Sequence, residues 1–243
     1  MRSRPTSQDR RLLRPSRGRA SAGPSSAGRR PILLIGSDGM APEVLDAVRA
    51  AGTHEPVGFL DDDADRHGTW LDGVPVLGGL DAATSHRDAE LVLCPARGGA
   101  RASLAARLAT AGIPDARYAV VRHPSVDVPR GCVPGPGTVL LAHVALAGDV
   151  RIGRHVMVMP NVTLHHGAVL EDFVTLAAGV SLGARVHVGR WAYVGMNASV
   201  RERVRVGADA VLGMGAAAVR DVPARETWAG VPAEVLRTWV EPW

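Results

Sequence analysis

The sequence predicts a small α/β domain followed by a parallel β-helix. Between Pro31 and Cys94, short apolar stretches alternate with a helical stretch and glycine turns. From Leu140 to Leu212, every sixth residue is aliphatic. A helix has an apolar period near 3.6 and a plain strand a period of 2, so a strict period of six fits neither alone. It indicates one short strand per hexad, joined by tight turns and wound into coils.

The first thirty residues differ from the rest in charge. Residues 1–30 hold nine of the 28 basic residues but one of the 24 acids, so the formal charge of +4 belongs to this tail and the remainder is net negative. We expect residues 1–30 to form a disordered basic tail, since arginine, serine, proline and glycine dominate it. Binding of the tail to nucleic acid or an anionic membrane is the less favoured reading.

Residues 31–115 are expected to form a Rossmann-like domain. The apolar run 32–35 is typical of a buried strand, and residues 41–52 read as a helix with Pro42 in its first turn and Gly52 as its C-cap. A second strand is expected at 56–60. A further strand, 91–94, then precedes a helical segment at about 99–112, which completes an α/β pattern.

The turn between the first strand and helix is a candidate substrate site. Gly36, Ser37, Asp38 and Gly39 form this turn, whose backbone N–H groups can point at a phosphate. Asp61 and Asp62 end the second strand and can accept hydrogen bonds from a ribose or a base. A plain structural turn explains the two glycines equally well, and an aspartate beside a phosphate would be repulsive.

Residues 116–136, rich in proline and glycine, are expected to be a connection, 137–219 the β-helix, and 220–243 a closing segment with a short capping helix at 234–239. The large aliphatic residues of the repeat are Leu140, Leu146, Ile152, Val158, Leu164, Leu170, Leu176, Leu182, Val188, Val194, Val200, Val206 and Leu212. A second, smaller apolar series precedes most of them by two residues, beginning with Val144, Val150 and Val156. Both series are expected to face the interior.

The composition indicates in which cell compartment the protein is expected. No apolar run reaches the length of a membrane span, and the arginine-rich start lacks the apolar core of a secretory signal. Cys94 and Cys132 are far apart and in no metal spacing, which favours a reduced, cytoplasmic protein with no metal.

Several motifs together resemble one family. They are the stretch 34–39, the run 57–63 with Gly73-Val74-Pro75-Val76-Leu77-Gly78, then His123-Pro124-Ser125, the hexads, and the ending Ala229-Gly230-Val231-Pro232-Ala233. Together they resemble the sugar O-/N-acetyltransferases of the NeuD and PglD type over about residues 31–238. The hexads and the Gly-Val-Pro-Ala ending are typical of β-helix acyltransferases, and the N-terminal half is typical of this subfamily.

The resemblance implies a left-handed β-helix in a homotrimer, with active sites between subunits. Acetyl-CoA would lie along the coils, and the N-terminal domain would hold a sugar or nucleotide-sugar acceptor. By the match to the family motif, His166 is the expected general base, a role that suits an imidazole because its pKa lies near working pH. The resemblance places acetyl-CoA at these positions: Thr175, Gly195, Met196, Gly213 and Met214. His165 is expected to be structural or supporting.

The sequence departs from the family at several of these positions. The carboxylate that normally follows the base and orients its imidazole is replaced by Gly167. Thr175 stands where a histidine usually meets the acetyl group, and Met159 replaces an asparagine. Asp38 and Met40 replace a small residue and a histidine in the N-terminal turn.

These departures leave alternatives open. A degenerate member could keep the scaffold and bind a ligand without catalysis. A zinc hydratase on the same fold would need three converging histidines, and the spacings of the coil histidines do not reproduce that pattern. The residues do not decide between an amine and a hydroxyl acceptor, nor do they identify the sugar or the acyl group.

Overall fold

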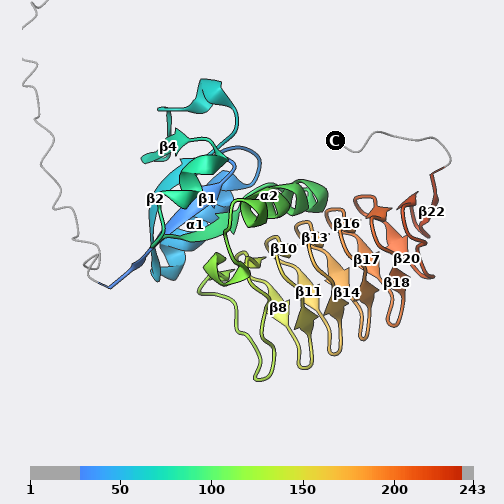
Figure 1. Ribbon diagram of the computed structural model, residues 1–243. Coiled ribbons are helices and arrows are strands. Elements are labelled where there is room, and N and C mark those ends of the chain that lie inside the picture. The colour runs from blue at the N-terminus through green and yellow to red at the C-terminus, as the bar shows by residue number, and fades with distance from the viewer. Residues whose placement is uncertain (1–27, 237–243) are drawn as a thin grey trace, which may run out of the picture.

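A computed structural model describes residues 28–236. The N-terminal part is an α/β domain, drawn in blue to green in Figure 1. Its elements are β1 (Arg30–Ile35), α1 (Ala41–Ala51), β2 (His54–Leu60), the 3-10 turn η1 (Ala64–Arg66), β3 (Trp70–Leu71), β4 (Val74–Gly78), η2 (Leu80–Thr84), β5 (Glu90–Leu93), α2 (Gly98–Thr110) and η3 (Asp115–Arg117). The expected strands and helices are thus present, and Gly52 caps α1 in the left-handed conformation at φ 66°.

The five strands form one sheet in the order β3-β4-β2-β1-β5. β4, β2, β1 and β5 are parallel, and β3 runs antiparallel to β4. The strands β1 and β5 are wholly apolar at their centres because helical elements cover both faces of the sheet. One face packs with α1 against the start of the β-helix, and the other packs with α2 and η2.

The β-helix begins after β6 (Val121–Arg122) and has three faces built from strands of two residues, or three in β21. The first face contains β7 (Val139–Leu140), β10 (Met157–Val158), β13 (Thr175–Leu176), β16 (Tyr193–Val194), β19 (Val211–Leu212) and β21 (Thr227–Ala229). The second contains β8 (Ala145–Leu146), β11 (Thr163–Leu164), β14 (Ser181–Leu182), β17 (Ser199–Val200) and β20 (Ala217–Ala218). The third contains β9 (Arg151–Ile152), β12 (Val169–Leu170), β15 (His187–Val188) and β18 (Arg205–Val206).

Each strand pairs in parallel with the strand one coil later, so residue i lies beside residue i+18. Leu164 pairs with Leu182, and Leu182 with Val200. The second residue of nearly every strand points inward, and together with the smaller apolar series it forms one continuous core. Both predicted apolar series therefore face the interior.

A left-handed residue stands at every corner of the coils. From position 137 to position 215, every sixth residue has φ between 53° and 73°. Glycine holds this position at Gly137, Gly167, Gly179 and Gly215, and other residue types hold the remaining ten. A left-handed conformation costs a non-glycine residue about 1–2 kcal/mol. The N–H of most of these residues bonds a carbonyl of the preceding coil, as from Arg185 to His166 at 2.9 Å.

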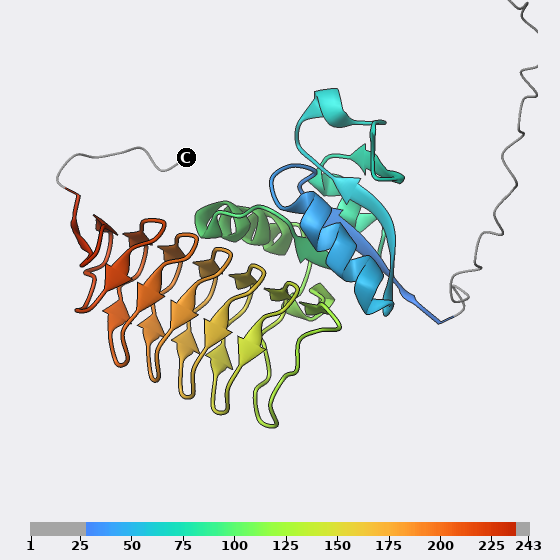
Figure 2. The same cartoon turned by 180° about the vertical axis from the view of Figure 1, so that it is seen from behind.

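A buried arginine joins the two parts. The helix α2 lies along the first face of the coils, as both views show (Figures 1 and 2). From it, Arg101 reaches the coils with 1% of its surface exposed. Its guanidinium donates to the carbonyls of Pro95 (2.8 Å), Ala96 (2.7 Å), His155 (2.9 Å), Phe173 (3.0 Å) and Val174 (3.0 Å), and to the Thr175 hydroxyl (3.0 Å).

The end of the chain differs from one expectation. A helix was expected at 234–239, but β22 (Glu234–Val235) is a strand that pairs antiparallel with β21. This hairpin gives the last coil hydrogen-bond partners that a helix would not offer. Residues 237–239 lie outside the described residues, as does the expected tail up to residue 27.

Candidate functional site

A cavity of about 640 Å³ opens where the strands β1, β2 and β5 end. Five of the six predicted substrate residues line it: Gly36, Asp38, Gly39, Asp61 and Asp62. Ser37, the sixth, is bonded to Asp61 beside it. The carboxyl ends of parallel strands are where α/β sheets bind ligands, and Ala100 and Leu104 of α2 also line the cavity. We call this space the upper cavity.

Three hydrogen bonds hold the carboxylate of Asp61 in place in the upper cavity. Asp61 Oδ2 accepts from the Ser37 N–H at 2.7 Å and from the Ser37 hydroxyl at 2.6 Å, and Oδ1 accepts from the Asp63 N–H at 3.0 Å. Burial alone would raise the pKa of Asp61, but these hydrogen bonds and nearby Arg66 outweigh it and lower the pKa. Asp61 is therefore an ionised acceptor, which suits recognition of hydroxyl groups.

The sequence did not indicate two arginines: Arg97, which lines this cavity, and Arg66, which bonds residues of the turn beside it. Arg66 Nη2 pairs with Asp38 at 3.0 Å, while its Nη1 bonds the Ser37 carbonyl at 3.2 Å. The pair offsets the repulsion that Asp38 was expected to exert on a phosphate. Arg97 lines the cavity and lies 5.3 Å from the Tyr193 ring centre. Arg97 follows a buried strand and precedes two glycines, a signal that would have located it.

The expected base lies elsewhere, on the edge between the second and third faces. His166 is exposed in the turn from β11 to β12, and His165 precedes it. Gly167 holds the left-handed corner at φ 70°, and a Cβ placed there would lie 3.2 Å from Cγ of Arg185. An arginine side chain thus covers the position at which the family has a carboxylate.

Thr175 is not on an open surface of the chain. It is fully buried beneath α2, where its hydroxyl donates to the Ala96 carbonyl at 2.6 Å and accepts from Arg101. The structure therefore places Thr175 in the junction between the two parts, and its expected contact with acetyl-CoA stays a prediction.

The four remaining cofactor positions follow the edge between the first and second faces. Met196 and Met214 are 46% and 68% exposed, one coil apart, and form an apolar ridge there. Position 195 requires a glycine for packing, because a Cβ there would lie 2.6 Å from the backbone nitrogen of Met214. At Gly213, a Cβ would meet that of Ala229 at 2.9 Å. The glycines thus permit close coils, and the methionines remain available to a ligand.

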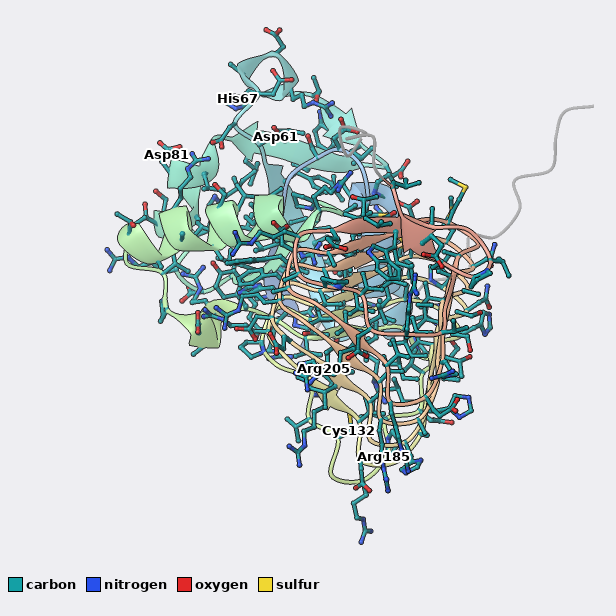
Figure 3. All side chains as sticks on the ribbon, turned by 90° about the vertical axis from the view of Figure 1, so that its right-hand side faces the viewer. Asp61, His67, Asp81, Cys132, Arg185 and Arg205 are labelled. Carbon is teal, nitrogen blue, oxygen red and sulfur yellow. The ribbon has the colours of Figure 1, made fainter. Side chains whose placement is uncertain are left out.

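The predicted residues do not converge in one chain. His166 and the methionine ridge lie on opposite edges of the second face. In Figure 3, Asp61 of the upper cavity and Arg185, which covers Gly167, lie at opposite ends of the molecule. Within residues 28–236 no group of three or more histidine, cysteine or acidic side chains is placed to hold a metal ion. Over the same residues, no helix is both long enough and apolar enough to cross a bilayer.

Residues 31–98 match the model of the PglD N-terminal domain. A GDP-perosamine N-acetyltransferase of Caulobacter crescentus, a histidine-to-alanine variant crystallised with CoA and GDP-perosamine, superimposes with a TM-score of 0.79. The two are 27% identical, and the alignment covers 86% of this chain and 97% of that one. This chain resembles PglD-type proteins.

Other comparisons agree with this assignment. The acetyltransferase domain of PglB from Neisseria gonorrhoeae, solved alone and with acetyl coenzyme A, is 26% identical. Its TM-score is 0.78, with 86% of this chain and all of that one covered. A UDP-3-O-acylglucosamine N-acyltransferase of Methylorubrum extorquens is 29% identical over 110 residues, which are 45% of this chain. That match spans about a quarter of the length of the curated relative. The chain is homologous to sugar N-acetyltransferases.

Proposed function

We propose that this protein transfers the acetyl group of acetyl-CoA to the amino group of a nucleotide-linked sugar. The proposal rests on one observation. This chain combines a match to the PglD N-terminal domain with coils similar to those of acetyltransferases that were crystallised with CoA or acetyl-CoA, one of them also with GDP-perosamine. An amine is favoured over a hydroxyl because the aligned relatives are N-acetyltransferases. Both cysteines are free and buried, which fits the proposed cytoplasmic location.

The reaction needs a base. The amine nitrogen attacks the thioester carbonyl, the bond between carbon and sulfur breaks, and CoA leaves as its thiol after a proton has moved from nitrogen. We assign the removal of that proton to His166, a step that a positioned base typically accelerates by about 10²–10⁴-fold. No described carboxylate is bonded to His166, whereas the His187 imidazole one coil later bonds Glu171 at 2.7 Å.

We further propose that the site forms between copies in a homotrimer. His166 and the methionine ridge lie on opposite edges of the second face, so a single chain cannot bring them to one substrate. The outward residues of that face are small, which suits close approach of a neighbouring copy: Ala145, Thr163, Ser181, Ser199 and Ala217. His166 of one copy could then face the acetyl-CoA edge of the next.

A non-catalytic scaffold is the second candidate. Gly167 and the burial of Thr175 favour it, because both positions lack the side chain that the family uses. The scaffold predicts binding of CoA without transfer to any amino sugar.

Turnover of His166→Asn tests the proposed function. The assay follows the release of the CoA thiol with acetyl-CoA and a panel of nucleotide-linked amino sugars, GDP-perosamine among them. We expect kcat to fall about 10²–10⁴-fold while CoA binding is retained. His165→Asn is the matched control and should keep most of the activity. Equal turnover in His166→Asn would refute the assigned base, and CoA binding without turnover in the wild type would favour the scaffold.

A further inference from the structure

A cation of the upper cavity contacts the coils. Within residues 28–236, Arg97 is the one lysine or arginine in the lining of this cavity. It immediately precedes α2, and its guanidinium lies over the ring of Tyr193, 5.3 Å from the ring centre. All lining residues belong to the N-terminal domain, whereas Tyr193 belongs to β16 on the first face of the coils (Figure 1). The function proposed so far gives no role to this contact.

The coils also fix the backbone on both sides of Arg97. Before it, the Thr175 hydroxyl donates to the Ala96 carbonyl at 2.6 Å. After it, a Cβ on Gly98 would lie 2.1 Å from the carbonyl oxygen of Phe173, so a glycine is needed for the chain to pass this close to the coil. The Arg97 side chain therefore starts from a point that is set relative to the coils.

Tyr193 is placed to orient the Arg97 guanidinium. It pairs with Thr175 as the next outward residue of the first face, and its side chain is half-buried, whereas that of Thr175 is fully buried. An arginine over an aromatic ring is attracted through its flat face. That contact restricts the arginine to few conformations and does not occupy the N–H donors at the edge of the guanidinium. Tyr193 thus orients the cation without competing for its hydrogen bonds.

Arginines outside the lining offset much of the negative charge in the upper cavity. Asp38 is paired with Arg66 at 3.0 Å, and Asp62 accepts two hydrogen bonds from Arg107, one of them at 3.2 Å. The third acid of the lining is Asp61. An anionic ligand beside the cation of this cavity therefore meets less repulsion than the three carboxylates alone would exert.

The lining has three kinds of surface. Asp61 accepts hydrogen bonds, Arg97 carries positive charge, and the remaining wall includes four apolar side chains: Ile35, Leu60, Leu80 and Leu104. A nucleoside diphosphate has the complementary parts, which are ribose hydroxyl donors, an anionic diphosphate and a flat base with two apolar faces. The cavity volume of about 640 Å³ lies within the range of about 300–1,000 Å³ that is typical of small-molecule sites.

We propose that Tyr193 of the coils is a positioning residue for nucleotide recognition by the N-terminal domain. Its ring holds Arg97 so that the guanidinium binds the diphosphate of a nucleotide in the upper cavity. The proposal rests on the proposed function and deepens it, because it assigns the diphosphate to Arg97 and gives the coils a part in binding the nucleotide. Paired hydrogen bonds from arginine to phosphate need a guanidinium of set orientation, which the ring supplies.

Binding without acetyl-CoA tests this assignment independently of turnover. Calorimetry on the full chain compares GDP with guanosine and UDP with uridine, and the ratio of the two Kd values in a pair is the gain from the diphosphate. In the wild type we expect a gain for at least one pair. In Arg97→Met the gain should fall about tenfold or more, because a charged hydrogen-bond donor is lost, while the Kd of the nucleoside stays unchanged.

Variants of Tyr193 separate positioning from a structural role. Tyr193→Leu removes the ring and should lower the gain about threefold, whereas Tyr193→Phe keeps the ring and should retain it. Tyr193→Leu added to Arg97→Met should cause no further loss, because Tyr193 acts through Arg97. A merely structural role of Tyr193 would instead weaken nucleoside and nucleotide alike, with or without Arg97.

Arg190→Met is the matched control. Arg190 also lies over an aromatic ring of the same coil, 5.7 Å from the ring centre of Trp191, but it does not line the cavity. This variant should bind every ligand as the wild type does.

Three results would overturn the proposal: no pair shows a gain in the wild type, the gain survives Arg97→Met, or Tyr193→Leu weakens binding equally when Arg97 is absent. Acetyl transfer together with any of these results would leave the proposed function standing. A gain that depends on Arg97 and Tyr193 supports the positioning role even if no acetyl transfer is found, so the two proposals fail separately.

Discussion

Removing the buried guanidinium of Arg101 should separate the N-terminal domain from the coils. In Arg101→Met the carbonyls of Pro95, His155 and Phe173 lose the one hydrogen bond that the described residues give each of them. A buried acceptor without a partner costs about 1–3 kcal/mol. The variant also no longer buries the guanidinium charge, whose desolvation is costly, and this gain offsets part of the cost of the three unpaired carbonyls. We therefore expect a loss of about 3–5 kcal/mol in the free energy of unfolding.

Denaturant unfolding, followed by tryptophan fluorescence, measures this loss. Trp191 reports on the junction, because its Cα lies 3.3 Å from a Cβ placed on Gly98 at the start of α2. We expect limited proteolysis of Arg101→Met to cut between the two parts before the coils. Arg107→Met is the matched control, since Arg107 is an exposed arginine of the same helix paired with Asp62, and it should unfold like the wild type. If Arg101→Met lies within about 1 kcal/mol of the wild type, the junction does not depend on this guanidinium.

Three further predictions follow from the coils. Gly167→Asp places a carboxylate next to His166, and Asp149 and Asp209 already adopt the same corner conformation. We expect kcat for acetyl transfer to rise about tenfold or more, because the carboxylate orients the imidazole. The control Gly167→Asn should show no such rise. His155 is fully buried, and neither ring nitrogen has a hydrogen-bond partner among residues 28–236. Burial lowers its pKa to about 4, so the unfolded chain binds more protons and stability should fall as pH drops from about 6.5 towards 4. Phe173 already adopts the corner conformation of His155, so His155→Phe should fold. In thermal melts, this variant should lose less stability than the wild type between pH 6.5 and 4. The same pH dependence in both proteins would contradict the role given to His155. Met214→Glu adds a negative charge beside the anionic acetyl-CoA and should raise the KM for acetyl-CoA about tenfold. The control is Val133→Glu in the connection, where the side chain is 83% exposed, and it should leave this KM unchanged.

The coils could be predicted from the sequence because their signal is local and repeated. Leu164 and Leu182 occupy equivalent inward positions one coil apart, so each hexad carries the same information as its neighbours. The turn before α1 was predictable for a similar reason, since Gly36 and Gly39 follow the wholly apolar run 32–35. That Gly36, Asp38 and Asp61 line one cavity follows from the rule that parallel strands end at the same edge.

Contacts between distant segments were not predictable. Nothing local distinguishes Arg101 from Arg107 on the same helix, yet one is buried against the coils and the other is exposed. The resemblance predicts that Thr175 meets acetyl-CoA, and no local pattern indicates that Arg101, 74 residues earlier in the chain, bonds its hydroxyl in a buried junction. The strand β22 replaced an expected helix because its partner β21 has unpaired backbone groups, which a local pattern does not record. The pairing of Arg66 with Asp38 likewise joins η1 to the turn before α1.

A crystal structure of the assembled protein with CoA and a nucleotide-linked amino sugar tests the central claim most directly. The account predicts a trimer in which the amino nitrogen lies within hydrogen-bond reach, about 3 Å, of His166 from one copy. It places CoA on the Met196 and Met214 edge of the next copy. A sugar bound far from every His166, or CoA on another face of the coils, would contradict the account.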